Sequence, residues 1–142
     1  MIEAANEVPL KPIGFGFDYP SDCICEWLHD DGFKLTFLIS SPSANFSVHV
    51  EYSGFPLAFR RGEETQYQRA LHRTIGGPSV NVYQDTTSEY LRAFLADAYG
   101  TVDAAELMHV VYLTGTICID VLSRQGPKIT RVTVDTKYGS IT

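Results

Sequence analysis

The stretch Met108-His-Val-Val-Tyr-Leu-Thr-Gly-Thr-Ile-Cys-Ile-Asp-Val-Leu-Ser123 decides the fold class. Two apolar runs rich in β-branched residues, 108–113 and 117–122, flank the turn-forming sequence Thr114-Gly115-Thr116. Such runs favour strands, and a short glycine-containing segment between them is typical of a hairpin. Because both runs are almost wholly apolar, we expect this hairpin to lie at the centre of a sheet.

The segment 46–53 carries a second strand signal. Apolar and polar residues alternate along it, so a strand here would place one face on the core and the other in water. The apolar positions are Phe46, Val48, Val50 and Tyr52, and the polar positions are Ser47, His49, Glu51 and Ser53. Short strands are also expected at 79–83 and 129–134.

The segment 23–40 predicts another hairpin. Asp31-Gly32 is a strong turn signal because both residues tolerate positive φ, and Phe33, Leu35, Phe37 and Ile39 alternate after it. A short helix over 21–29, capped by Ser21, is the competing interpretation. The choice between them determines which way Trp27 faces.

Two helices are expected, at 62–75 and 87–99. In the first, acidic residues begin the segment and basic residues end it, which suits the helix dipole. In the second, Thr86 and Glu89 have the spacing of a capping box. Its apolar stripe is Tyr90, Leu91, Phe94, Leu95 and Ala98. One further helical turn is expected at 103–107.

These elements predict an α+β fold with a mainly antiparallel sheet of about six strands and about two helices. The order of elements is not the alternating pattern of a parallel α/β sheet. The 142 residues fit a single domain over 1–142, with a loose N-terminal lead-in over 1–12.

Net charge and composition limit the classes of partner that the chain can bind and its cellular location. The formal net charge is −6, which repels phosphate and disfavours general nucleic-acid binding, but favours a basic protein partner. No run approaches the ~18 apolar residues of a membrane span, and the N-terminus lacks a signal-peptide pattern. The three cysteines are too few for a disulfide framework. We therefore expect a soluble, cytoplasmic protein.

No motif predicts catalysis, a metal or a cofactor. Cys23 and Cys25 share one side of a strand but lack the further ligands of a zinc site, so small buried hydrophobic residues are the simpler interpretation. The histidines lie in four separate segments, at His29, His49, His72 and His109. Cys118 lies inside an apolar strand, where a thiol is inert. No nucleophile elbow or phosphate loop is present, so we expect a protein that is not an enzyme.

An acidic run interleaved with aromatic residues is the best candidate for a binding surface. Anchor rings beside acids suit an interface with a basic partner. The alternative is a solvated loop whose aromatic rings join the core. The expected partner-binding residues are Asp18, Asp22, Glu26, Trp27, Asp30 and Asp31.

Residues 108–123, followed by Gly126-Pro127-Lys128-Ile129, resemble the C-terminal hairpin of some small bacterial immunity proteins. The likeness lies in chain length, a capped helix before the hairpin, and an Ile-Asp-Val-Leu-Ser strand running into a proline-containing turn. The resemblance implies an inhibitor that binds and occludes a cognate toxin in the cytoplasm. Many such toxins are nucleases with basic clefts, which agrees with the acidic charge. It assigns no binding residue to this chain.

Two other functions stay open. A small-molecule-binding domain or an enzyme would need a deep pocket with convergent polar groups such as His49 or His109. Its aromatic wall would come from Phe15, Phe17, Phe37, Phe46, Tyr52 and Phe94. A structural subunit of a larger assembly would expose an apolar patch. The sequence leaves the oligomeric state open.

Overall fold

Nine strands form two antiparallel sheets in the part of the chain that the computed structural model describes, residues 9–14, 22–53, 58–74, 81–98, 103–115 and 117–133. The five-stranded sheet has the order β1 (Lys11–Pro12), β6 (Val82–Gln84), β7 (Met108–Leu113), β8 (Cys118–Ser123), β5 (Ala58–Gly62). The four-stranded sheet has the order β2 (Ile24–Asp30), β3 (Lys34–Ser40), β4 (Phe46–Ser53), β9 (Lys128–Thr133). The α+β class is confirmed, with more strands than the expected six.

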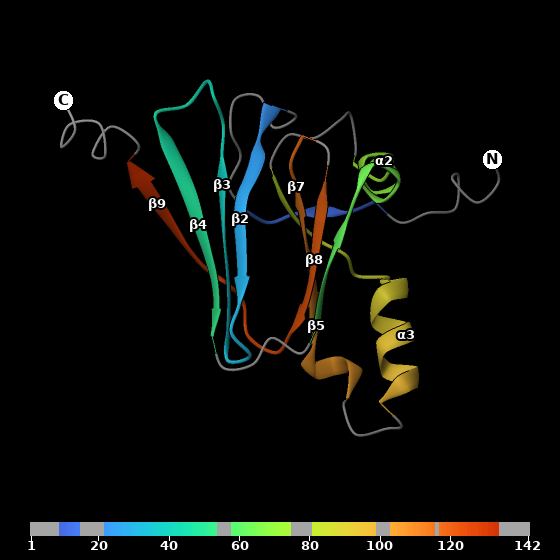
Figure 1. Cartoon of the computed structure of the whole chain (residues 1–142). Coiled ribbons are helices and arrows are strands. Elements are labelled where there is room, and N and C mark those ends of the chain that lie inside the picture. Colours follow the sequence, from blue (N-terminus) through green and yellow to red (C-terminus); the bar gives the residue numbers. More distant parts are fainter. Residues whose placement is uncertain are drawn as a thin grey trace.

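The two sheets pack face to face around one large core (Figure 1). Period-two alternation in β3 and β4 supplies one side of this core, and every second residue of β7 and β8, which are buried on both faces, supplies the other. Tyr52 and Tyr112 meet across the interface, where their buried hydroxyls hydrogen-bond to each other. The main contributors are Leu35, Phe37, Ile39, Val48, Val50, Val82, Val110, Ile119 and Val121.

Both helices lie on the side of the five-stranded sheet that faces away from the other sheet (Figure 1). The helix α2 (Glu64–Leu71) buries Tyr67 in a second core with Tyr83, Val111 and Leu113. The helix α3 (Glu89–Asp97) has no buried residue, and its expected apolar stripe is only half-buried. Among the described residues, no helix is long and apolar enough to cross a bilayer.

The hairpin expected over 23–40 is confirmed as β2 and β3, and residues 24–29 are strand, not helix. The turn is centred one position later than expected. The Asp31 N–H donates to the Lys34 carbonyl at 3.2 Å, and Gly32 has a φ of 90°. Gly32 and Phe33 are therefore the central residues, because only glycine takes that φ readily at the first of them. Phe33 leaves the expected alternation and is 69% exposed.

The expected capping box at Thr86 and Glu89 is wrong. The Asp85 carboxylate accepts the backbone N–H of Thr87, which holds the chain in a turn and delays the helix. Ser88 is the N-cap, and its Oγ accepts the Leu91 N–H at 2.8 Å.

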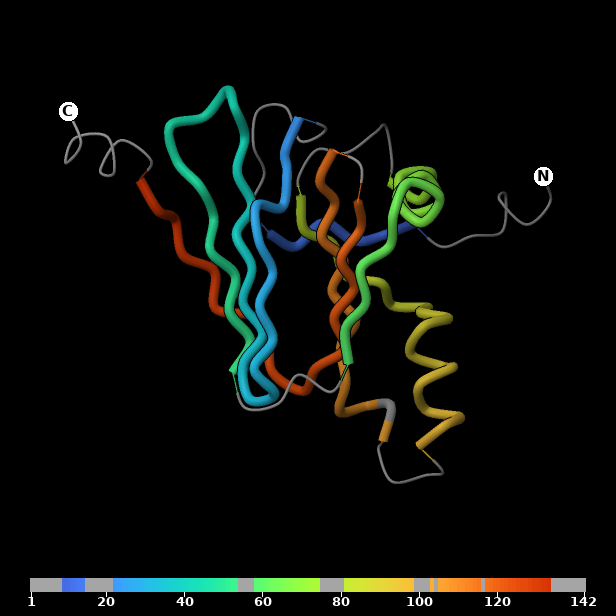
Figure 2. The backbone as a smooth tube through the Cα atoms, in the orientation of Figure 1, coloured from blue at the N-terminus to red at the C-terminus, as the bar shows by residue number. Residues whose placement is uncertain are grey.

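The remaining differences lie at short elements. The strand β5 was not expected, because 58–62 contains two arginines and lacks alternation. The strand β1 lies inside the expected lead-in and pairs with β6. The central place of the 108–123 hairpin is confirmed, as is the short helix η2 (Ala104–Glu106). Figure 2 follows the backbone through these elements from the N-terminus to the C-terminus.

Candidate functional site

The expected partner-binding residues gather on β2 and the turn that follows it. Asp22, Glu26, Asp30 and Asp31 are all exposed, while Asp18 lies outside the described residues. In the described part of the chain β2 pairs only with β3, so it forms an edge of its sheet. Residues 22–33 contain four acidic residues and no lysine or arginine, which makes this edge locally negative.

Trp27 faces solvent, not the core. A register shift between Cys25 and Trp27 places Trp27 opposite Leu38, on the outer face of the sheet. There the Trp27 ring is 43% exposed and lies 5.7 Å from the His49 ring, measured between centroids. The same face exposes Ile24, at 55%, and Val132. We call Ile24, Trp27, Leu38, His49 and Val132 the outer apolar patch.

Two of the acids also shape the hairpin. The Asp31 carboxylate accepts the backbone N–H groups of Phe33 and Lys34 at 2.9 and 2.8 Å, and these bonds lower its pKa. Asp30 accepts the N–H of Gly32 at 2.9 Å. Asp22 and Glu26 make no hydrogen bond or ion pair with the described residues, so their charges are more available to a partner than those of Asp30 and Asp31.

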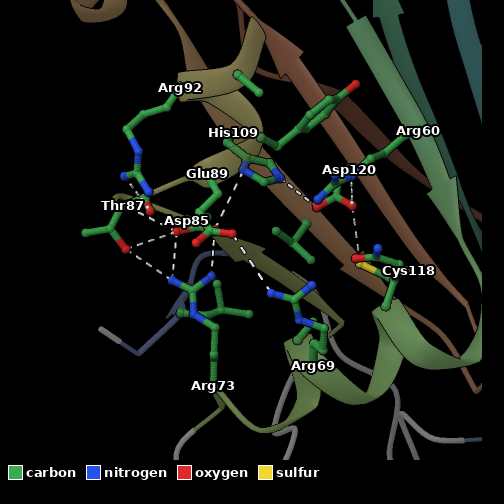
Figure 3. A pocket seen from close by; sticks show the side chains of 16 residues that line it. Arg60, Arg69, Arg73, Asp85, Thr87, Glu89, Arg92, His109, Cys118 and Asp120 are labelled. Carbon is green, nitrogen blue, oxygen red and sulfur yellow. Dashed lines mark hydrogen bonds and ion pairs between the residues drawn. The ribbon is translucent and has the colours of Figure 1, made fainter. Parts of the chain in front are cut away.

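A second candidate lies on the opposite side of the molecule, in a cleft between α2, α3 and the outer face of the five-stranded sheet (Figure 3). The cleft measures about 550 Å³. Four arginines from β5, α2, the segment after α2, and α3 line it, together with three acidic residues and one histidine. These residues are Arg60, Arg69, Arg73, Arg92, Asp85, Glu89, Asp120 and His109. We call it the arginine cleft.

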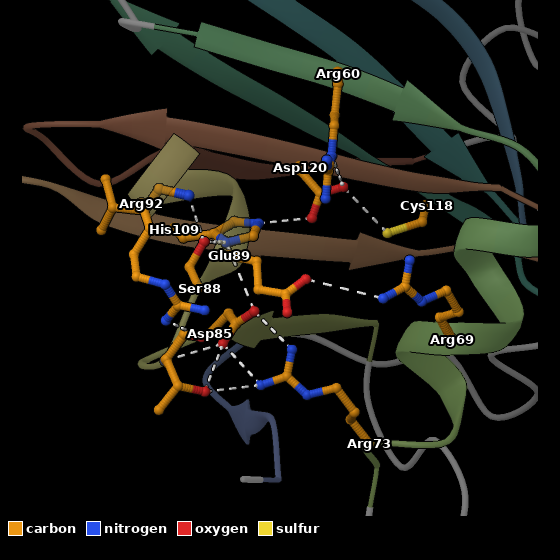
Figure 4. Close-up of polar contacts among 12 residues, drawn as sticks. Arg60, Arg69, Arg73, Asp85, Ser88, Glu89, Arg92, His109, Cys118 and Asp120 are labelled. Carbon is orange, nitrogen blue, oxygen red and sulfur yellow. Dashed lines mark hydrogen bonds and ion pairs between the residues drawn. The ribbon is translucent and has the colours of Figure 1, made fainter. Parts of the chain in front are cut away.

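The floor of the arginine cleft is a buried polar network around His109 (Figure 4). His109 Nε2 lies 2.6 Å from an oxygen of Asp120, and His109 Nδ1 lies 2.6 Å from Ser88 Oγ. An ionised Asp120 requires a donor, so His109 Nε2 carries a proton, while Nδ1 and the Ser88 hydroxyl form the second hydrogen bond. The Tyr90 ring meets the imidazole edge-on at 5.6 Å.

Arginines hold both buried carboxylates as anions. Arg73 donates to the two oxygens of Asp85 at 2.7 and 2.8 Å, and Arg60 Nε donates to Asp120 at 3.1 Å. Burial opposes ionisation and raises the pKa of each carboxyl group. For Asp85 the Arg73 pair outweighs burial, and for Asp120 the bonds from His109 and Arg60 outweigh it, so both pKa values are lowered.

The arginine cleft lacks an activated nucleophile. Burial raises the pKa of the Cys118 thiol far above neutrality, and the nearby Asp120 charge raises it further. Ser88 is buried, and its Oγ already serves as the cap of α3 and the partner of His109. The order of these groups resembles a catalytic triad, but its hydroxyl is committed to structure.

The cysteines and aromatic residues noted in the sequence lie mainly in or against the core. Cys23 and Cys25 pack against the main core with raised thiol pKa values, in the case of Cys23 to about 11, chiefly because of burial. Among the described residues, no three or more His, Cys, Asp or Glu side chains are placed so that they could hold one metal ion. Of the residues expected to line an aromatic cavity, Phe37 and Tyr52 fill the core, Phe46 packs against it, and Phe94 lies on α3. Phe15 and Phe17 lie outside the described residues.

Sequence reasoning missed the arginine cleft, although two signals pointed to it. Residues 60–73 contain four arginines, at positions 60, 61, 69 and 73. In the 108–123 hairpin, His109 and Asp120 are polar residues in apolar strands and fall on the same face in an antiparallel register. Asp85 and Ser88 gave no signal, because tertiary packing alone brings them to His109.

Comparisons with known proteins found no matching family model, no matching curated protein and no matching solved structure.

Proposed function

We propose that this chain is a protein-binding module that docks a basic partner on β2 and the outer apolar patch. The observation that carries the proposal is the 43% exposure of Trp27 on an acidic edge strand. Exposed tryptophan is uncommon on a surface with no partner, because leaving such a ring in water forfeits a large burial energy. Tryptophan is also enriched among residues that dominate binding energy.

The surroundings of Trp27 define the chemistry of the partner. Ile24 and Val132 extend the apolar contact along the outer face, so the partner must present an apolar or aromatic recess. The four acids of residues 22–33 flank that contact and attract lysine and arginine. In the described part of the chain, no strand pairs with the outer edge of β2, so its backbone offers further hydrogen bonds of the kind used when a strand is added to a sheet.

The biological role that fits a basic partner best is that of an immunity protein. A toxin that degrades nucleic acid needs a basic cleft, and an acidic protein with an aromatic anchor suits occlusion of such a cleft. The role agrees with the resemblance of the 108–123 hairpin to immunity proteins. It requires no catalytic residue in this chain.

The test begins with capture of the partner from lysate of the source organism and continues with the purified pair. The chain contains a single tryptophan, so its fluorescence reports docking directly. We expect the emission to shift to shorter wavelength as the partner buries Trp27. Trp27→Ala and Glu26→Lys should each weaken binding at least tenfold, and added salt should weaken it further.

The matched control is Glu106→Lys, which reverses an exposed acid on η2, in the other layer of the molecule. It changes the net charge as Glu26→Lys does and should leave the affinity within about twofold. For the immunity role, co-expression of the captured protein should arrest growth, and the wild-type chain but not the Trp27→Ala variant should restore it. A captured partner that binds both variants as tightly as wild type would overturn the proposed surface.

A further inference from the structure

The arginine cleft carries more positive charge than its own acids neutralise. Two arginines are committed to the buried carboxylates, Arg73 to Asp85 and Arg60 to Asp120. The remaining charges at the rim are Arg69, Arg92 and Glu89, which leaves one net positive charge from the arginines and acids alone. This local balance opposes the sign of the whole chain, whose net charge is −6.

The two rim arginines are only weakly engaged. Arg69 approaches Glu89 at 3.9 Å, and the two side chains are 64% and 77% exposed. Arg92 makes one long contact, 3.5 Å from Nη1 to the Thr87 carbonyl. Among the described residues these are their only polar contacts, so most of their N–H donors remain available. Exposed pairs of this kind contribute little to folding, so a ligand can replace them at small cost.

Glu89 occupies the place that an external anion would take. In Figures 3 and 4 its carboxylate lies within the cleft and points toward Arg69, with Arg73 and Arg92 around it. Because the side chain is largely exposed, it can swing into solvent without breaking a buried contact. Its departure leaves Arg69 and Arg92 facing the cleft with two positive charges.

We infer that the arginine cleft binds a small phosphorylated molecule, with Arg69 and Arg92 gripping the phosphate and Glu89 competing for the same place. Two charges match a phosphate monoester dianion. Its three terminal oxygens can accept from both guanidinium groups, whereas a carboxylate offers only two oxygens to the same donors. The cleft volume lies within the range of small-molecule sites.

The rest of the ligand has an apolar wall beside the phosphate position. Leu10, Ala70, Ala93 and Val111 line the same cleft. The Tyr90 ring is less available, since Arg60 stacks on it with Cζ 4.1 Å from the centroid. The ligand is therefore expected to carry a compact apolar or aromatic group next to its phosphate.

The test is a calorimetric titration with three matched probes: phenyl phosphate, inorganic phosphate and benzoate. We expect phenyl phosphate to bind most tightly, inorganic phosphate more weakly, and benzoate at least tenfold more weakly than phenyl phosphate. Arg69→Ala and Arg92→Ala should each weaken phenyl phosphate at least tenfold. Glu89→Gln should strengthen it severalfold, because the competing carboxylate is gone.

The control for general charge is Arg131→Ala, which removes an arginine that lies over the Phe46 ring in the other sheet. This variant should bind phenyl phosphate as wild type does. Arg60 and Arg73 are left intact in every variant, because their loss would leave buried carboxylates without an ion-pair partner and would destabilise the fold. Equal affinity for benzoate and phenyl phosphate would overturn the phosphate assignment. Absence of phenyl phosphate binding, or unchanged binding in Arg69→Ala and Arg92→Ala, would overturn the site.

The Trp27 fluorescence separates this inference from the proposed docking surface. Trp27 lies on the outer face of the four-stranded sheet, so phenyl phosphate in the arginine cleft should leave its emission unchanged. A shift of that emission by phenyl phosphate, equal in wild type and in Arg69→Ala, would place the anion elsewhere and would also overturn the inference.

Discussion

The outer faces of the two sheets differ in which side chains they bury: one buries charged groups, and the other exposes apolar ones. On the five-stranded sheet, helices cover the face, and ionised Asp85 and Asp120 are buried with partners. On the four-stranded sheet no described helix covers the face, and Trp27, Ile24 and Val132 lie open. On the first face, side chains pair with buried charges, so mutations there should lower the stability of the protein. The second contributes little to folding, and its side chains remain free for recognition.

Asp120→Ala should produce the largest effect. Removal of this carboxylate leaves His109 Nε2–H and Arg60 Nε without their acceptor. The free energy of unfolding in urea should fall by about 3–5 kcal/mol, as for other buried pairs that lose one partner. Asp97→Ala, an exposed acid on α3, is the control and should stay within about 0.5 kcal/mol. If Asp120→Ala lowered the free energy of unfolding by less than about 1 kcal/mol, the buried network would not contribute to stability as proposed.

Acidification tests the same face without mutation. The pKa values of Asp85 and Asp120 are lowered, so the unfolded chain binds protons more readily than the folded one. Their stabilisation is complete above the unfolded pKa of about 3.9 and is lost as the pH falls through the lower folded values. The loss should be smaller than that of Asp120→Ala, because a protonated carboxyl still fills its space and hydrogen-bonds.

Unfolding free energies measured from pH 7 down to pH 2 provide the check. Asp85→Asn removes one of the two titrating groups, so its stability should depend less steeply on pH below about pH 4. An identical slope in this variant and in wild type would contradict the role of Asp85.

Ser88→Ala should have an intermediate effect. The Ser88 hydroxyl caps α3 and hydrogen-bonds to His109, so its loss removes two hydrogen bonds at once. We expect a decrease of about 1–2 kcal/mol in the free energy of unfolding. Ser88→Thr keeps the hydroxyl and should recover most of that decrease. If both variants lose the same amount, the cap is not the reason.

Trp27→Ala should have the smallest effect on stability. Trp27 is 43% exposed, so the free energy of unfolding should change by less than about 1 kcal/mol. Thermal and urea unfolding of the variant give the measurement. A loss as large as that of Asp120→Ala would erase the difference between the faces and identify Trp27 as a structural residue.

The sequence predicted the strands whose periodicity is strong and missed those without it. The alternation of 46–53 and the apolar runs of 108–122 record one-sided and two-sided burial directly, so β4, β7 and β8 were predictable. The strand β5 carries Arg60 and Arg61, and it is held by pairing with β8, which no local pattern records. The number of sheets could not be predicted either, because alternation indicates how a strand is buried but not which element packs against it.

The candidate sites divide in the same manner. The acidic edge at residues 22–33 is contiguous in sequence and was identified, although the exposure of Trp27 depended on a register shift that the sequence does not announce. The arginine cleft joins residues from 60 to 120. Local reasoning noted His109 only as one of four scattered histidines, and the antiparallel register and the turn at Asp85 bring it to Asp120 and Asp85.

The pairing of β9 with β4 has a consequence for synthesis on the ribosome. Between Ser53 and Lys128 the chain makes β5, β6, β7, β8 and both helices, so β4 emerges long before its neighbour exists. Until then one edge of β4, with its alternating apolar residues, is open to pairing with other chains. Contacts so distant in sequence also form slowly. A nascent chain stalled before Lys128 is therefore expected to need protection by a chaperone.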